Sequence, residues 1–124
     1  MAEQQIGEQR LRQFHLPYFE SNIVVSLRGV LTLLEQLEVP IPLQIRLAII
    51  GAQGYVGHIS RYDHPENKII DRNELFFDAV TLDSWGVDPG IFLKSVFDQI
   101  WNACGYQYSY SYDADGAWKP RMDS

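Results

Sequence analysis

The chain has 124 residues, of which 46% are hydrophobic and 13% aromatic, and its formal net charge at pH 7 is −6. This length suits one domain, and the apolar composition excludes an intrinsically disordered chain. No apolar run approaches the roughly 18 residues of a membrane helix, and the polar residues 1–5 do not resemble a secretory signal. A single cysteine, Cys104, excludes a disulfide framework and a cysteine-rich zinc site. We therefore expect a soluble, cytoplasmic domain with no membrane partner.

The N-terminal and C-terminal segments differ from the rest of the chain. Residues 1–19 are rich in Gln and Glu, which predicts a polar tail, a linker or a loosely docked helix. Pro17 either interrupts such a helix or lies in its first turn. Residues 20–119 carry the patterns of a single α+β domain, and residues 120–124 form a C-terminal tail.

The first strong pattern is helical. Ser21 is placed to cap a helix that runs to about Leu37, and Pro40 and Pro42 end it. Apolar residues recur at the spacing of an amphipathic helix, and three more widen its face: Ile23, Leu27, Val30, Leu31, Leu34 and Leu37, with Val24, Val25 and Leu33. Such an apolar helix is expected to be covered by a sheet or by another chain.

Three predicted strands follow this helix. Apolar and other residues alternate over residues 43–50, which indicates a half-buried strand, and the loop 51–54 has the size of a hairpin turn. Residues 55–59 form the return strand, in which Gly57 indicates a bulge or a close backbone approach. Residues 74–82 form a third strand that is apolar on both faces.

A second helix and a last strand complete the pattern. Asp88 and Pro89 start a helix, and Gly105 ends it. Its apolar stripe consists of Leu93, Val96, Phe97, Ile100, Trp101 and Cys104. The alternation in 106–112 predicts a strand, followed by a turn at 113–116. The predicted fold is therefore α+β, in the order α-β-β-β-α-β, with a mostly antiparallel four-stranded sheet and two helices packed on one face.

The alternating tyrosines are the first candidate binding site. Bases and sugars stack on aromatic rings, so a ligand or single-stranded nucleic acid is one candidate occupant of this face. Its residues are Tyr106, Tyr108, Tyr110 and Tyr112, with Tyr55 and Trp118 contributing. The alternative is that the rings cover the sheet while their hydroxyl groups reach water. We favour this alternative because no basic residue lies within 106–112.

A polar loop is the second candidate. His58, Asp63, His64 and Asp71 are residue types that bind metals or act as general bases, so a metal-dependent hydrolase is one hypothesis. Their spacing fits no zinc pattern, which favours an ordinary polar loop. Cys104 lies on the apolar stripe of its helix and is interpreted as a core thiol rather than a nucleophile. We therefore expect no catalytic residue, no metal and no cofactor.

Charge bears on possible partners. The ten Lys and Arg residues are scattered along the chain without forming a run, and sixteen acidic residues outnumber them. Affinity for nucleic acids comes largely from basic side chains that neutralise phosphates. We therefore do not expect this domain to bind nucleic acid directly.

Several segments, in order, resemble one protein family. They are residues 47–55, residues 70–75, residues 97–105 with the sequence FDQIWNACG, and residues 112–118 with the sequence YDADGAW. They are similar to the C-terminal region of prokaryotic Schlafen AlbA-like domain proteins, which are described as ATP-binding proteins or transcriptional regulators. Ala52 and Gln53 depart from this resemblance, because the family commonly has Val-Arg there. The family's AlbA-like domain itself lies outside this sequence.

The resemblance implies an accessory role. The first hypothesis is a non-catalytic assembly or regulatory domain of a Schlafen-like, nucleic-acid-associated bacterial protein, with an upstream AlbA-like domain as its partner. A homodimer is also expected, because the helix over residues 23–37 is apolar on more than one face. The alternatives are the aromatic binding module and the metal-dependent hydrolase.

Overall fold

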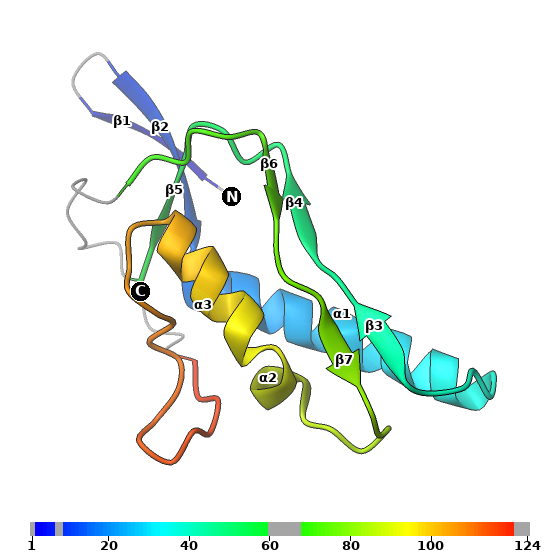
Figure 1. Cartoon of the computed structure of the whole chain (residues 1–124). Helices are drawn as coiled ribbons and strands as arrows, with labels where there is room; N and C mark the ends of the chain where they lie inside the picture. The colour runs from blue at the N-terminus through cyan, green and yellow to red at the C-terminus, as the bar shows by residue number, and fades with distance from the viewer. Residues whose placement is uncertain (1, 7–8, 60–67, 121–124) are drawn as a thin grey trace.

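The computed structural model describes residues 2–6, 9–59 and 68–120, with side chains from Arg12 onward. In this part the chain is α+β, in the order β1–β2–α1–β3–β4–β5–β6–β7–α2–α3 (Figure 1). The α+β class is confirmed. The single four-stranded sheet is not, because the strands described here form one sheet of three strands and two sheets of two.

The first sheet joins the start of the chain to its middle. β1 (Ala2–Ile6) pairs antiparallel with β2 (Gln9–His15), and β2 pairs in parallel with β5 (Tyr55–His58). Residues 1–19 were predicted as a polar tail, a linker or a docked helix, yet their described part contains two strands. The mostly polar sequences AEQQI and QRLRQFH show little of the alternation that marks a half-buried strand.

Helix α1 (Leu16–Gln36) begins five residues before the predicted cap at Ser21. His15 is its N-cap, because the backbone N–H of Tyr18 donates a hydrogen bond of 3.2 Å to the imidazole Nδ1. Pro17 lies in the first turn, where proline lacks only an N–H that would have no helical partner. The sequence does not predict this cap, because histidine is not among the residues that usually cap helices.

The predicted strands 43–50 and 74–82 each divide into two. β3 (Leu43–Ile45) pairs antiparallel with β7 (Val80–Leu82), and β4 (Ala48–Ile50) pairs antiparallel with β6 (Glu74–Phe76). Together they form a long two-stranded ribbon that runs obliquely to α1, with its β3–β7 end next to the helix (Figure 1). We call these four strands the ribbon.

The hairpin predicted across residues 51–54 is wrong. Gly51 and Gly54 do adopt positive φ angles of 81° and 88°, but β4 pairs with β6 rather than with β5. The backbone N–H groups of Gly51 and Ala52 donate hydrogen bonds of 2.7 and 3.1 Å to the carbonyl oxygen of Asn73. The loop is therefore tied to the segment that leads into β6, which leaves β5 to pair with β2.

The second predicted helix is confirmed at both ends but broken inside. The side chain of Asp88 accepts a hydrogen bond of 2.9 Å from the N–H of Gly90 and caps α2 (Pro89–Phe92). α3 (Lys94–Ala103) follows after Leu93, and Gly105 has the positive φ of 95° expected at a helix end. The centre of the core consists of fully buried residues from this region: Leu93, Val96, Phe97, Ile100, Trp101 and Cys104.

The chain after α3 is not the strand predicted for residues 106–112. Residues 105–119, which we call the strap, form a single isolated bridge between Tyr112 and Trp118. The turn predicted at 113–116 is confirmed, because Oδ1 of Asp113 accepts 2.9 Å hydrogen bonds from the N–H groups of Asp115 and Ala117. The strap packs over α1 and α3, because Ser109 and Ser111 form hydrogen bonds to residues of these two helices.

Candidate functional site

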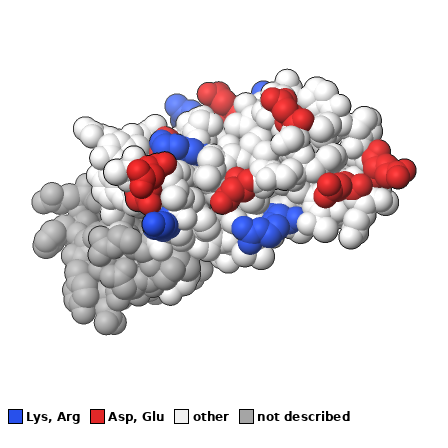
Figure 2. Space-filling view, turned by 90° about the horizontal axis from the view of Figure 1, so that it is seen from below, with Lys and Arg blue, Asp and Glu red and all other residues white. Residues whose placement is uncertain are grey.

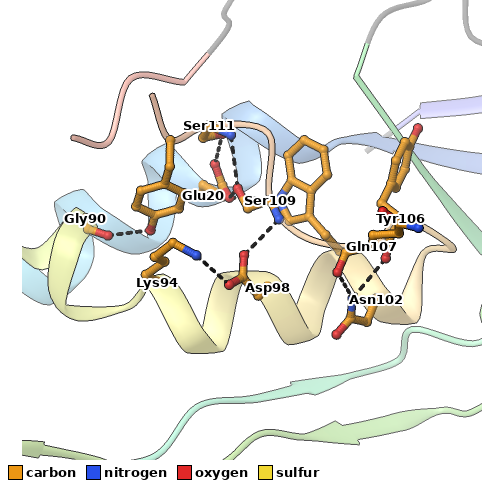
Figure 3. Close-up of polar contacts among 11 residues, drawn as sticks. Glu20, Gly90, Lys94, Asp98, Asn102, Tyr106, Gln107, Ser109 and Ser111 are labelled. Carbon is orange, nitrogen blue, oxygen red and sulfur yellow. Dashed lines mark hydrogen bonds and ion pairs between the residues drawn. The ribbon is translucent and has the colours of Figure 1, made fainter. Parts of the chain in front are cut away.

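Glu20 is a fully buried charged residue, and it lies on α1. Its Oε2 accepts hydrogen bonds of 2.8 Å from the indole N–H of Trp101 and 2.6 Å from the hydroxyl of Ser109. Its Oε1 accepts from the hydroxyl of Ser111 and, at 3.3 Å, from the indole N–H of Trp118. Figure 3 shows both serines pointing from the strap toward Glu20. One carboxylate thus joins α1, α3 and the strap.

Two opposing effects act on the Glu20 carboxyl group. Burial raises its pKa above the usual value of 4.5 because the charged form loses its hydration, and the four hydrogen bonds act in the opposite direction. Burial is the larger effect. The two indole groups can only donate, so each needs an acceptor at this position.

The serines that hold Glu20 are themselves held in place. The backbone N–H of Ser111 donates to the hydroxyl oxygen of Ser109 over 3.2 Å, which leaves the hydroxyl hydrogen of Ser109 for Glu20. The backbone N–H of Ser109 donates to Asp98 over 2.9 Å, and Asp98 forms an ion pair of 2.8 Å with Lys94 on the same helix (Figure 3). The donors and acceptors around Glu20 all have hydrogen-bond partners, as expected of groups that stabilise the fold. We call Glu20 and its four donors the Glu20 anchor.

Three of the predicted aromatic site residues lie together. Tyr106 and Tyr108 each pack edge-on against Tyr110, with ring centroids 5.6 and 5.2 Å apart, and the first and last of the three also pack against Trp101. Tyr108 is 52% exposed and Tyr110 is 45% exposed. The inward side of this segment is formed by the serines, so the exposed rings cover the anchor around Glu20.

The other three aromatic residues lie elsewhere. The hydroxyl of Tyr112 donates a hydrogen bond to the carbonyl oxygen of Gly90, so its side chain reaches the start of α2. Trp118 packs on the same glycine so closely that an added Cβ would lie 2.7 Å from the indole ring. Tyr55 packs against Phe14 at 6.4 Å, on the first sheet. The six predicted residues therefore do not share one platform.

The predicted metal or hydrolase cluster is only partly visible. Asp63 and His64 lie outside the described residues. His58 faces His15 across β2 and β5, with ring centroids 5.5 Å apart, while Asp71 is exposed beside a hollow near α3. Within the described ranges, no three His, Cys, Asp or Glu side chains converge as metal ligands would.

Cys104 is confirmed as a core thiol. It is buried, and burial raises the pKa of its thiol to about 12. An added Cβ at Gly57 would lie 2.6 Å from its sulfur atom, so the predicted close backbone approach at this glycine is also confirmed. A thiol so poorly ionised is unsuited to act as a nucleophile.

One side of α1 faces solvent with apolar side chains. Val25, Val30, Leu33 and Leu37 are 65%, 50%, 54% and 64% exposed. They belong to an uncharged surface, which we call the α1 face and which consists of Tyr18, Asn22, Val25, Ser26, Gly29, Val30, Leu33, Gln36 and Leu37. A groove of about 370 Å³ runs along one border of this surface, between α1 and the ribbon residues Ile45 and Leu47.

The charge distribution on one face and the apolarity of the helices bear on possible partners. On the face shown in Figure 2, basic side chains are interspersed with acidic ones and form no continuous basic area. Among the helices described, none is both long and apolar enough to cross a membrane.

Comparison with known proteins gives no relative. The sequence matches no family model, no curated protein and no solved structure. The resemblance to the Schlafen AlbA-like proteins therefore stays a prediction.

Proposed function

We propose that the chain is a non-catalytic assembly module that self-associates through the α1 face. The observation that supports this proposal is a group of four large apolar side chains, each at least half exposed, on one uncharged side of α1. Contiguous exposed apolar surface of this kind marks interaction sites in proteins that otherwise keep such residues inside. The role expected from the family resemblance, an accessory domain of a Schlafen-like protein, is compatible with such a module.

The reactive groups favour the same proposal. The carboxylate of Glu20 and the hydroxyls of Ser109 and Ser111 are hydrogen-bonded to one another and buried, which leaves them no position for a substrate. The thiol of Cys104 is buried and poorly ionised. A binding function does not require any of these groups to react with a substrate.

Light scattering during size-exclusion chromatography, over protein concentrations from about 5 to 500 µM, tests the proposal. An interface limited to one helix face lies at the small end of the range for specific interfaces, so we expect a dimer with a dissociation constant in the micromolar range. Val25→Lys on the α1 face should abolish the dimer. Thr81→Lys, a matched control at an exposed ribbon position, should not. A wild-type monomer at every concentration, or a dimer indifferent to Val25→Lys, would contradict the proposal.

The exposed ring pair Tyr108 and Tyr110 supports a second candidate, an aromatic ligand site. Titration with a single-stranded oligonucleotide at low salt, followed by tyrosine and tryptophan fluorescence, tests it. Saturable quenching that Tyr108→Ala removes would favour this candidate. Unchanged fluorescence at millimolar oligonucleotide would end it.

A further inference from the structure

Two histidines lie together where the first sheet meets α1. His15 is the last residue of β2 and His58 is the last residue of β5, and the parallel register places them side by side. Their ring centroids are 5.5 Å apart, and the ring of Tyr18, in the first turn of α1, lies 4.6 Å from that of His15. All three rings line a hollow of about 460 Å³ at the start of the helix.

The hydrogen bond that caps α1 requires a neutral imidazole. The Nδ1 atom of His15 accepts from the backbone N–H of Tyr18 over 3.2 Å. An imidazole nitrogen accepts only while it carries no hydrogen, so the proton of neutral His15 lies on Nε2. Protonation would turn Nδ1 into a donor that faces another donor. It would also place a positive charge at the N-terminus of α1, where the helix dipole disfavours cations.

His58 is equally unsuited to carry a positive charge. Its Nδ1 atom is buried and has no hydrogen-bond partner among the residues that the structure describes. In a neutral ring this nitrogen can remain without a hydrogen, whereas both nitrogens of an imidazolium are donors. A protonated His58 would therefore bury an N–H group without an acceptor, which is costly.

The described surroundings offer no charge that compensates for protonation. The other residues that line the hollow are uncharged between about pH 5 and 8, namely Gln13, Phe14, Tyr18, Phe19 and Asn22. Arg12 lies on the opposite side of β2, over the ring of Tyr55. The carboxylate of Glu20 faces Trp101 and the strap. Two protonated rings would therefore repel each other at this site.

We propose that His15 and His58 form a pH-sensitive switch that opens the joint between the first sheet and α1 on acidification. As the pH falls through about 6.5, where histidine ordinarily takes up a proton, the N–H of Tyr18 loses its acceptor and the ends of β2 and β5 separate. The unfolded chain binds protons that the folded joint does not accommodate, so stability is lost as the pH falls through this range. The switch does not depend on self-association through the α1 face.

Urea denaturation at about pH 7.5 and 5.5 tests the switch. His15→Asn keeps a capping oxygen, and His58→Phe keeps a ring, but neither new side chain takes up a proton. A histidine that stays neutral in the folded state raises the unfolding equilibrium constant about tenfold at pH 5.5. Relative to the double variant, which keeps all other titrating groups, the wild-type constant should rise about 10–100-fold, and that of each single variant at most about tenfold.

The third histidine of the chain supplies the control. His64→Gln should leave the wild-type response to pH unchanged. A response that disappears with His64→Gln, or a wild type that responds to pH as the double variant does, would overturn the proposal.

NMR spectroscopy of the wild-type chain gives a readout that needs no substitution. At pH 7.5 the ring nitrogen shifts of His15 should show its proton on Nε2. On titration to pH 5.5, the protection of the Tyr18 amide against hydrogen exchange should fall at least about tenfold as His15 is protonated, while the Phe97 amide in α3 keeps its protection. A proton on Nδ1 at pH 7.5, or unchanged protection of Tyr18 once His15 is charged, would contradict the switch.

Discussion

Glu20 shows how one buried side chain can decide whether several segments pack together. Glu20→Gln keeps the shape of the side chain but places an amide N–H₂ where an acceptor stood. The serine hydroxyls can rotate to accept from it, whereas the indole of Trp101 or Trp118 is left with an unpaired N–H. We expect Glu20→Gln to lower the free energy of unfolding by about 1–3 kcal/mol in urea denaturation.

The matched control for this substitution is Glu74→Gln, at an exposed position of β6. It makes the same chemical change without burial, so its effect should stay within about 0.5 kcal/mol. Equal effects of the two substitutions would show that the hydrogen bonds to Glu20 contribute nothing to stability.

The pH dependence of stability follows from the raised pKa of Glu20. Because its pKa in the folded state lies above the unfolded value, the folded state binds this proton more tightly. Its contribution to stability is therefore fully present below about pH 4.5 and is lost as the pH rises through the folded-state pKa. We expect the stability difference between wild type and Glu20→Gln to grow as the pH falls from 7 toward 4.5. Urea denaturation at several pH values measures this difference, and a shrinking one would contradict the assignment.

The contact between Gly57 and Cys104 makes a second prediction at the residue scale. Gly57→Ala forces a methyl group to within 2.6 Å of the Cys104 sulfur, and we expect a loss of about 1–3 kcal/mol in thermal or urea unfolding. Adding Cys104→Ala should recover part of this loss. Recovery stays incomplete because a side-chain carbon of Leu16 lies 3.2 Å away. Gly86→Ala, in open space, is the control, and an equal loss there would refute the steric explanation.

Among elements, the sequence predicted helices better than strands. The stripe of α3 and its cap at Asp88 are local signals, and both are confirmed. Strand pairing is set by distant segments, so residues 55–59 were predicted as a strand but without their parallel partner β2. Ser109 and Ser111 alternate with tyrosines in the sequence, a pattern that predicts a strand. They turn inward because Glu20, about ninety residues earlier, needs donors, and a local pattern contains no such information.

The strap is the element whose removal should have the largest effect. A chain that ends at Gly105 loses both serines and Trp118, which leaves the buried carboxylate of Glu20 with one of its four donors. We expect this variant to lack a cooperative unfolding transition by circular dichroism. A chain that ends at Pro120 keeps all four and serves as the control. A cooperative transition in the shorter chain would show that α1 and α3 pack without the strap.

At the scale of the whole molecule, the Glu20 anchor couples distant parts of the chain. Its partners lie 81 to 98 residues away in the sequence, on α3 and on the strap. Contacts of such long range make one folding unit of segments that would otherwise unfold separately. The hydrophobic α1 face lies on the same helix, so the anchor also fixes the element that we propose for assembly.

The order of Glu20 and its hydrogen-bond donors along the chain affects how the protein folds during synthesis. A ribosome produces α1 before α3 and the strap, and at that stage the carboxylate of Glu20 has none of its four donors. Of these donors Trp118 emerges last, so the network closes only after the strap has left the exit tunnel. Until then α1 displays the apolar residues Val25, Leu33 and Leu37 on one side and has an unfinished core on the other. A nascent chain in this state is a natural target for chaperones, and neighbouring chains on one polysome would meet through the same helix.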